Sequence, residues 1–471
     1  MAQEDDVTSS MAVSFDSDLM TRYGQSGPRY TSYPTAMQFN QRIESREYHL
    51  AAACSDGAVA KDPLAIYLHV PFCLSPCFYC GCNKIVTRRL DQADTYVRHL
   101  LDEIALRGLH FDRGRVVEQM HFGGGTPTFL PKKKLIEIID RLDRMFQLTS
   151  AVDRDYSIEI DPRNIDDFGL RLLAGLGFNR ISLGVQDFDD AVQRAVNRVQ
   201  PLETVARVYD AARAIGFQSI NFDLIYGLPL QTAAGFATTL DHVIQMRPDR
   251  LAVYGYAHMP HLFKAQRQLR SEELPDPATR LSLLQLSIDK LTAAGYVYIG
   301  MDHFALPTDS LARAKLDGTL HRSFQGYTTH ANRDLVSLGV SAIGQVGRLY
   351  VQNHKTLGEY QAAIANGELP SQRGVSMNAD DLIRKEVIHQ IMCNGIVDIV
   401  QVEARCGIRF DEYFADELER LRTLEADGLV VVTGASILLT PTGRLLMRTV
   451  AMTFDAYLAA DSRAARMSRV I

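Results

Sequence analysis

The sequence predicts an α/β protein built on an incomplete TIM-type (β/α)6 barrel, with an N-terminal arm before it and a mainly helical domain after it. Strand-like and helix-like stretches alternate from residue 63 onward, which is typical of a parallel sheet with crossover helices. Residues that can carry chemistry follow these strands one after another. Near residue 375 the composition changes and helical patterns dominate. We therefore expect an arm over 1–50, a partial barrel with an extension over 51–374, and a winged-helix-like domain over 375–471.

The N-terminal arm lacks the barrel pattern. Residues 1 to about 17 are polar, and we expect them to be disordered. From Arg29 to Ala36 the arm is rich in tyrosine and proline. Because a residue that precedes proline avoids the helical region, this stretch is expected to be extended.

Six strands and the helices between them make up the predicted barrel. The strands are short apolar runs, and the helices carry apolar residues at spacings of three and four. The strands are Ala65–Val70, Gln119–Phe122, Tyr156–Ile160, Arg180–Val185, Ser219–Ile225 and Arg250–Tyr256. The clearest helices are Ala93–Arg107, Lys133–Phe146 and Leu202–Ile215, and a helix over 276–294 with a strand over Val297–Met301 extends the barrel.

Chemistry in TIM-type barrels lies at the carboxyl ends of the strands, and the sequence follows this rule. A cysteine-rich loop follows the first strand and a glycine-rich run follows the second. Polar residues stand at or near the ends of the next strands, so all of these groups are expected to meet in one pocket. The residues are Gly123–Thr128 for the second strand, Glu159 and Asp161 for the third, Gln186 for the fourth, Asp223 for the fifth, and Ala257 with His258 for the sixth.

The segment after residue 375 has the outline of a winged-helix module, which binds DNA in other proteins. It predicts helices over Asp380–Ile391 and Phe410–Ala426, a hairpin over Gly428–Thr440 with Gly434 at its turn, and a closing helix over Leu445–Ala459. Acidic residues are interspersed here without a basic recognition face. We therefore expect a lid or packing role rather than DNA binding.

Composition excludes several classes of protein. Of the 471 residues, 46% are hydrophobic and 23% are charged, as in soluble globular proteins. No apolar run reaches the roughly eighteen residues of a membrane span. The net charge of −6 argues against a nucleic-acid partner. The acidic, polar start of the chain does not resemble a secretory signal, so the cysteines are expected to be reduced and the protein cytoplasmic.

A cluster of cysteines is the most informative motif. Four of the seven cysteines lie within ten residues, and Cys73, Cys77 and Cys80 form a Cys-x3-Cys-x2-Cys pattern. Thiolates so close together are expected to hold a metal or a cluster. A four-iron cluster normally takes one thiolate per iron, so three thiolates leave one iron open to a small molecule. Structural zinc is the alternative, although it usually takes two separated ligand pairs and the other three cysteines here are isolated.

This motif, with aromatic residues between its second and third cysteines, resembles the signature of radical S-adenosylmethionine (SAM) enzymes. Longer stretches resemble one branch of that superfamily, the oxygen-independent coproporphyrinogen III oxidases, over roughly residues 15–471. These stretches are Tyr30–Ala36, Tyr67–Lys84, Gly123–Thr128, Gly184–Phe188, Asp223–Pro229, Gly300–Phe304, Phe324–Tyr327 and Ser468–Ile471.

The resemblance implies a radical SAM partial barrel and an enzyme of haem synthesis. The enzyme would oxidatively decarboxylate two propionates of coproporphyrinogen III to vinyls, yielding protoporphyrinogen IX, with SAM cleaved to methionine and 5′-deoxyadenosine. It would hold one [4Fe-4S] cluster on Cys73, Cys77 and Cys80. A one-electron donor and an electron acceptor are also implied, and a monomer is expected.

The resemblance also implies two bound SAM molecules. Residues matching the contacts of the SAM at the open iron are Tyr67, Gly124, Gly125, Thr126, Glu159, Gln186, Arg198, Asp223 and Ala257. Residues matching the contacts of a second SAM are Tyr79, Gly81, Cys82, Gln325 and Ile343, with Phe324 beside them; Cys82 is also the candidate catalytic residue, and Tyr79 stands where the family usually has phenylalanine.

Two other functions compete with this interpretation. A related haem-binding radical SAM protein that delivers haem is expected to lack Cys82 and the Tyr30–Ala36 arm, and both are present. A non-catalytic iron–sulfur electron carrier is expected to supply four cluster thiolates and no SAM pocket. The four propionates of the substrate call for cations, for which Arg29, Lys84, Arg88 and Arg163 are candidates.

Overall fold

The computed structural model describes residues 13–24, 26–56, 62–331 and 333–458. The expected disorder before residue 13, the end of the predicted closing helix at Ala459 and the matching stretch Ser468–Ile471 lie outside these residues. Within them, every helix is too short or too polar to cross a membrane.

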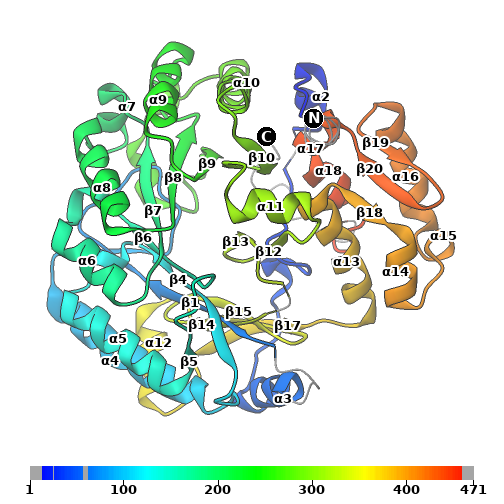
Figure 1. Cartoon of the computed structure of the whole chain (residues 1–471). Helices are drawn as coiled ribbons and strands as arrows, with labels where there is room; N and C mark the ends of the chain where they lie inside the picture. The colour runs from blue at the N-terminus through cyan, green and yellow to red at the C-terminus, as the bar shows by residue number, and fades with distance from the viewer. Residues whose placement is uncertain (1–12, 25, 57–61, 332, 459–471) are drawn as a thin grey trace.

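The core of the molecule is a curved, mostly parallel sheet, open on one side as the predicted partial barrel requires (Figure 1). All six predicted strands are present, and a seventh parallel strand joins them beside β1. In spatial order the parallel strands are β9 (Arg250–Gly255), β8 (Ser219–Tyr226), β7 (Arg180–Gln186), β6 (Asp155–Ile160), β4 (Val116–Gly124), β1 (Leu64–Val70) and β14 (Asp334–Leu338).

Helices cover the outer face of this sheet (Figure 1). They form because one face of each helix is apolar; in α5, Leu135, Ile138, Ile139 and Leu142 are all buried. α8 ends at Gly216, whose φ of +100° is the left-handed conformation that favours glycine. The helices are α4 (Leu90–Gly108), α5 (Lys132–Met145), α6 (Asp167–Gly175), α7 (Asp190–Ala195), α8 (Leu202–Ile215), α9 (Ala233–Met246) and α10 (Pro277–Ala293).

Antiparallel strands extend the sheet at both edges. Beyond β9 lie β11 (His303–Ala305) and β10 (Val297–Gly300). Beyond β14 lie β15 (Ile343–Val346), β16 (Leu349–Asn353) and β17 (Ser371–Ser376). The remaining elements of this part are β2 (Phe72–Cys73), β3 (Ile85–Val86), β5 (Gln147–Leu148), α11 (Ser310–Leu316), α12 (Leu357–Ala365) and a hairpin of β12 (His321–Ser323) and β13 (Gly326–Thr328).

A buried ion pair ties α4 to this extension. Arg107 Nε lies 3.0 Å from Glu103 Oε1, and neither side chain is exposed. Asn353 of β16 donates to Glu103 at 2.8 Å, and the Tyr360 hydroxyl of α12 donates to it at 2.7 Å. Each carboxylate oxygen is hydrogen-bonded, as a charge buried in protein requires.

The C-terminal part is helical with a small three-stranded sheet. Its elements are α13 (Ala379–Asn394), β18 (Ile396–Asp398), α14 (Ile399–Cys406), α15 (Phe410–Tyr413), α16 (Ala415–Ala426), β19 (Val430–Val432), β20 (Ser436–Leu439), α17 (Pro441–Leu445) and α18 (Met447–Met452). The predicted hairpin turns at 433–435, and β18 adds a third strand to it. The closing helix predicted over Leu445–Ala459 is wrong in extent: among the described residues, α17 ends at Leu445 and α18 covers only Met447–Met452.

The N-terminal arm packs between the barrel extension and the C-terminal part. α2 (Ser17–Tyr23) lies beside α17 (Figure 1), where Ser14 donates to Pro441 O at 3.2 Å. The stretch Arg29–Ala36 that follows is bent rather than extended as predicted, with Tyr30 at φ of +45°. It joins the C-terminal part, since the Tyr30 hydroxyl donates to Asp455 at 2.9 Å. α3 (Ser45–Asp56) completes the arm. The predicted division of the chain into three domains stays a prediction; α3 spans its first boundary and β17 its second.

Candidate active site

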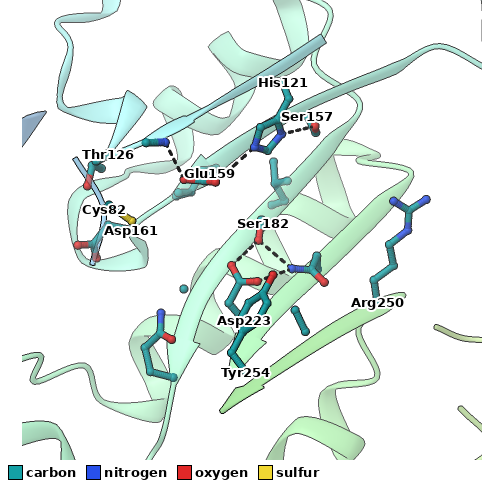
Figure 2. A pocket seen from close by; sticks show the side chains of 18 of the residues that line it. Cys82, His121, Thr126, Ser157, Glu159, Asp161, Ser182, Asp223, Arg250 and Tyr254 are labelled. Atoms are coloured by element: carbon teal, nitrogen blue, oxygen red, sulfur yellow. Dashed lines mark hydrogen bonds and ion pairs between the residues drawn. The ribbon is translucent and has the colours of Figure 1, made fainter. Parts of the chain in front are cut away.

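A cavity of about 400 Å³ lies inside the partial barrel and runs from the carboxyl ends of its strands to their amino ends, where Arg180, Ser219 and Arg250 line it. Cys82, Thr126 and Asp161 stand together at one end, Arg250 at the other, and Glu159 and Asp223 between them (Figure 2). The predicted site residues that line the cavity are Cys73, Cys77, Tyr79, Cys80, Cys82, Gly124, Gly125, Thr126, Glu159, Gln186, Arg198, Asp223 and Gln325.

The cysteine loop is held at both of its ends. The short parallel pairing of β2 with β3 brings its start and its end together. His69 of β1 contacts Asn83 O through Nε2 at 2.9 Å and the Tyr67 hydroxyl through Nδ1 at 3.1 Å. Asn197 donates to Pro76 O at 2.7 Å from the far side. The loop is therefore fixed to the barrel rather than free in solvent.

The thiols of this loop have different electrostatic surroundings. Burial raises the pKa of Cys73 to about 11. A hydrogen bond from Cys82 and the nearby charge of Lys84 lower the pKa of Cys80 to about 5, and the same hydrogen bond raises the pKa of Cys82. The lowered pKa favours the thiolate form of Cys80, which suits a cluster ligand.

The donor set fits a four-iron cluster with an open iron. Three thiols face one cavity, and thiolates are the ligands that such clusters take. Gly125 leaves room for the cluster loop, because a Cβ there would lie 3.0 Å from Cys73 Sγ and 2.7 Å from Phe72 O. Among the residues that the structure describes, no three His, Cys, Asp or Glu side chains are placed to share one metal ion. A cluster needs no such arrangement, since each of its irons takes its own thiolate.

The glycine run lies against the cysteine loop and Glu159. β4 continues through Gly124, two residues further than predicted. The Gly124 N–H donates to Glu159 Oε2 at 3.1 Å, and the N–H of Thr126 donates to Phe72 O at 2.8 Å. Gly124 has φ of +117°, and a Cβ there would meet the His69 ring at 2.6 Å. Only glycine fits at this position.

Glu159 is an ionised carboxylate pointing into the cavity. His121 Nε2 lies 3.3 Å from Glu159 Oε1, and His121 Nδ1 lies 2.7 Å from Ser157 Oγ (Figure 2). Burial alone would raise the pKa of Glu159, but the hydrogen bonds from His121 and Gly124 outweigh it and lower this pKa below its ordinary value. A negative acceptor is thus fixed beside the cluster loop.

Asp223 lies deeper in the cavity, on β8. Ser182 donates to Asp223 Oδ2 at 2.7 Å, and Asn221 donates to Oδ1 at 2.9 Å (Figure 2). Burial, with the neighbouring charge of Glu159, raises the pKa of Asp223 to about 6. β7 separates β8 from β6, so the two carboxylates stand on strands that are not neighbours.

Arg198 connects the cysteine loop to the fourth strand. Its Nη1 lies 3.5 Å from Cys77 Sγ, and its Nη2 donates to Gly184 O at 2.7 Å. Asp161 balances the charge at 3.5 Å and also pairs with Arg163 at 2.6 Å. Burial alone would lower the pKa of Arg198, but Tyr79 and Asp161 raise it, so the guanidinium stays charged.

Four predicted residues lie outside the lining of this cavity: Tyr67, Gly81, Ala257 and Ile343. Tyr67 is in the middle of β1 rather than at its end, where its ring stacks on His121 with centroids 5.9 Å apart. Ile343, on β15, packs near Phe39, Phe324 and Tyr350. Because these four residues do not line the cavity, their contact with SAM stays a prediction.

Sequence reasoning missed a clamp formed by Gln266. This buried side chain donates to Tyr79 O at 2.9 Å and to Ala257 O at 3.1 Å, and it accepts from the Met259 N–H at 2.6 Å. It joins the cysteine loop to the end of β9. His121 was also missed; its position on β4, next to a strand that ends in Glu159, is the signal that could have found it.

The candidate propionate-binding cations are mostly engaged. Arg29 pairs with Asp302, and Arg163 pairs with Asp161. Lys84 donates to Cys80 O at 3.0 Å, and Arg88 is exposed. Lys84 and Arg163 line the cavity, whereas Arg29 and Arg88 do not.

Known proteins match this chain along almost its whole length. The model of the Radical SAM superfamily matches residues 67–243, and that of the HemN C-terminal domain matches residues 377–446. The oxygen-independent coproporphyrinogen III oxidase of Pseudomonas aeruginosa is 48% identical, over 98% of this chain and 99% of that protein. The protein of the same name from Escherichia coli is 45% identical, over 98% and 99%.

A solved structure of the same family has the same fold as this chain. The coproporphyrinogen III oxidase (HemN) from Escherichia coli, described as a radical SAM enzyme, superimposes with a TM-score of 0.90 at 44% identity, covering 95% of this chain and 100% of that one. Both the barrel and the C-terminal part are included in that coverage. The chain therefore belongs to the oxygen-independent coproporphyrinogen III oxidases of the radical SAM superfamily.

Proposed function

We propose that this chain oxidatively decarboxylates coproporphyrinogen III to protoporphyrinogen IX in haem synthesis, converting two propionates to vinyls. The observation that carries the proposal is the meeting of three cysteine thiols with Glu159 and Asp223 in one cavity inside the barrel. Family membership implies a [4Fe-4S] cluster and SAM. When bound, these two groups supply a 5′-deoxyadenosyl radical, which takes a hydrogen from the propionate β-carbon.

Each protein group has a defined task in this proposal. Cys73, Cys77 and Cys80 hold the cluster, and Arg198 supplies positive charge beside Cys77. Glu159 and Asp223 accept hydrogen bonds from a bound SAM, since charge-assisted bonds to hydroxyl or ammonium groups are strong. Because Gly124 and Gly125 have no side chains, the backbone carbonyls of this run can come close to the methionine end of SAM.

After hydrogen removal, the propionate loses carbon dioxide and one electron to become a vinyl. The electron passes to an acceptor, and a separate one-electron donor reduces the cluster. The electron donor and the electron acceptor are the proposed partners. The enzyme is proposed to act as a monomer in the cytoplasm. The protein aims the radical and excludes water, which the placement of the cavity inside the barrel supports.

The proposal includes a second SAM. Tyr79, Cys82 and Gln325 line the same cavity as the cluster thiols, so a second ligand would lie next to the first. Gln325 donates to Ile66 O at 3.2 Å, and its buried Oε1 has no partner among the described residues, which leaves an acceptor for a ligand donor. Gly81 and Ile343 do not line this cavity, so they would contact only a part of the second SAM that extends beyond it.

One anaerobic assay tests the function. Purified protein with a reconstituted cluster receives SAM, a chemical reductant and coproporphyrinogen III. We expect protoporphyrinogen IX, methionine and 5′-deoxyadenosine, and no product from the Cys77→Ala variant. A haem-delivery protein, the competing function, would bind haem tightly under the same conditions and leave coproporphyrinogen III unchanged.

A further inference from the structure

A second, smaller cavity of about 60 Å³ lies where the N-terminal arm, the β12–β13 hairpin and α13 meet. Its lining includes Tyr30–Tyr33 and Phe324 from two of the family-matching stretches, but the function proposed above gives its cations no task. Three cations line it: Arg322 from β12, Arg333 next to β14, and Lys385 from α13. The lining residues that the structure describes include no aspartate or glutamate. The cavity therefore concentrates positive charge without a protein carboxylate inside it.

Arg322 is the clearest sign that an anion belongs here. Its Nε and Nη1 are buried and have no hydrogen-bond partner among the described residues. Its Cζ lies 4.6 Å from the centroid of the Tyr327 ring, which supports the guanidinium on one face. Burying donors of a charged group without partners is costly, so such groups in native proteins normally find an ion, a ligand or water.

The neighbouring cations leave part of their charge unmatched. Among the described residues, Lys385 Nζ contacts only neutral groups: Gln345 Oε1 accepts from it at 3.1 Å, and the Tyr350 ring centroid lies 5.1 Å away. Arg333 pairs with Glu118 at 3.0 Å and with Asp62 at 4.0 Å, but its Nε is buried without a hydrogen-bond partner among the described residues. Two guanidinium groups and one ammonium group suit a carboxylate, which accepts several charge-assisted hydrogen bonds.

The β12–β13 hairpin contributes residues to both this cavity and the active site. Gln325 and Tyr327 line the main cavity, while Arg322, Ser323 and Phe324 of the same hairpin line the smaller one. The cationic smaller cavity therefore lies beside the main cavity, with β12 and β13 between them. At about 60 Å³ the smaller cavity has room for a carboxylate group but not for a tetrapyrrole ring.

We propose that Arg322, Lys385 and Arg333 bind one propionate carboxylate of the tetrapyrrole substrate, and that this contact orients the ring for decarboxylation of another propionate. The inference rests on the function proposed above. The carboxylate of a second SAM has the same chemistry, so the test has to separate the two ligands.

The experiment compares Arg322→Gln and Lys385→Gln with the parent protein. Arg171→Gln is the matched control, because Arg171 is an exposed arginine of α6. Binding of coproporphyrin III, the stable oxidised form of the substrate, is followed by fluorescence alongside its tetramethyl ester, which lacks the charges. Equilibrium dialysis measures SAM binding without a porphyrin. Thermal unfolding of each ligand-free protein reports on folding.

We expect each variant to bind coproporphyrin III about 10- to 100-fold more weakly, as the loss of hydrogen bonds to a charged group predicts. Their affinity for the ester and for SAM, and the control's affinity for all three, should not change. Ligand-free Arg322→Gln should unfold at the same temperature as the parent or higher, since it loses an unpartnered buried charge.

Three results would overturn the inference: unchanged porphyrin affinity in both variants, a loss confined to SAM, or a lower unfolding temperature of Arg322→Gln, which would make Arg322 structural. If Arg322→Gln does not fold, Lys385→Gln alone decides. Failure of the parent protein to convert coproporphyrinogen III would instead contradict the proposed function. Conversion by the parent with unchanged variants would contradict only this binding site.

Discussion

The guanidinium of Arg198 lies 3.5 Å from the sulfur of Cys77. A buried cation at this distance stabilises negative charge on a thiolate, whether that thiolate is free or binds iron. The side chain of Arg198 is held near the carboxyl end of β7, because its Nη2 donates to Gly184 O at 2.7 Å. The barrel therefore contributes to the cluster site electrostatically, without supplying a ligand from any of its strands.

Replacing Cys77 by alanine should abolish the cluster. A cluster on three thiolates loses a corner ligand, and the fourth loop cysteine, Cys82, is hydrogen-bonded to Cys80 rather than placed to substitute. Iron content and visible absorption of the anaerobically reconstituted protein check this. Cys406→Ala, on α14, is the control and should keep all of its iron. A fully loaded cluster in Cys77→Ala would contradict the assignment.

Glu159→Gln and Asp223→Asn should each weaken SAM binding about 10- to 100-fold and leave iron content unchanged. Both carboxylates face the cavity, while neither contacts a cysteine sulfur in the hydrogen bonds that the described residues form. Equilibrium dialysis with labelled SAM measures the affinity. Asp210→Asn on α8, outside the cavity, serves as control. Parent-level affinity in both variants would mean that the SAM pocket lies elsewhere.

The raised pKa of Asp223 predicts a pH-dependent stability. Its pKa moves from 3.8 to about 6 on folding, so the folded state binds this proton more tightly than the unfolded state. The associated stabilisation is complete below about pH 4 and is lost as pH rises through about 6. Asp223→Asn keeps a neutral side chain at every pH. Its free energy of unfolding should therefore exceed the parent's by up to about 3 kcal/mol above pH 7, and by nothing near pH 4.

Chemical denaturation of the ligand-free proteins at pH 4, 6 and 8 measures this difference. Asp210→Asn again controls for the loss of a carboxylate, and its difference from the parent should not follow the same curve. A difference for Asp223→Asn that is constant across this range would show that Asp223 titrates normally.

The barrel was predictable because its signals are local. Each of the six strands is a short apolar run, and each is followed by a helix whose apolar residues share one face, so the order of strand ends could be read along the chain. Glu159, Gln186 and Asp223 could be placed in one pocket on that basis alone. The same reasoning fails for β17, because Ser371–Ser376 is polar and joins the sheet only through its partner β16.

The contacts that the sequence could not predict join distant segments. Gln266 lies in a polar stretch of short 3-10 helix, and nothing in its neighbours indicates that it is buried and bridges Tyr79 and Ala257. Likewise, nothing in the sequence around Arg322 indicates that it shares a cavity with Lys385. The closing helix failed for a related reason: packing of α17 and α18 against α13 and β20 outweighs local helical preference.

Gln266→Ala should loosen the cysteine loop without removing a ligand. The substitution leaves Tyr79 O and Ala257 O without their shared donor and removes the acceptor for Met259 N–H. We expect full iron loading, faster loss of the cluster in air, and SAM cleavage reduced about tenfold or more, as for supporting groups of metal sites. Gln266→Glu keeps the acceptor but loses both donated bonds, so it should share the defect. Normal cluster lifetime in both variants would contradict this role.

Cys82 should be needed for turnover but not for cluster assembly. It lies two residues after Cys80 and lines the cavity, and its N–H lies 3.4 Å from the Cys80 sulfur. A residue so placed cannot readily reach a fourth corner of the cluster, but it touches whatever occupies the cavity. Cys82→Ser retains a donor of smaller size, so iron and sulfide should stay near normal.

Protoporphyrinogen formation by Cys82→Ser should fall about 10- to 100-fold, the range found when groups around a metal site are changed. The measurement pairs an iron determination with the anaerobic turnover assay on the same preparation, with Cys54→Ser as the matched control because Cys54 is an exposed cysteine of α3. Iron loss equal to that of Cys80→Ala would identify Cys82 as a ligand. Undiminished turnover would show that the thiol takes no part in the reaction.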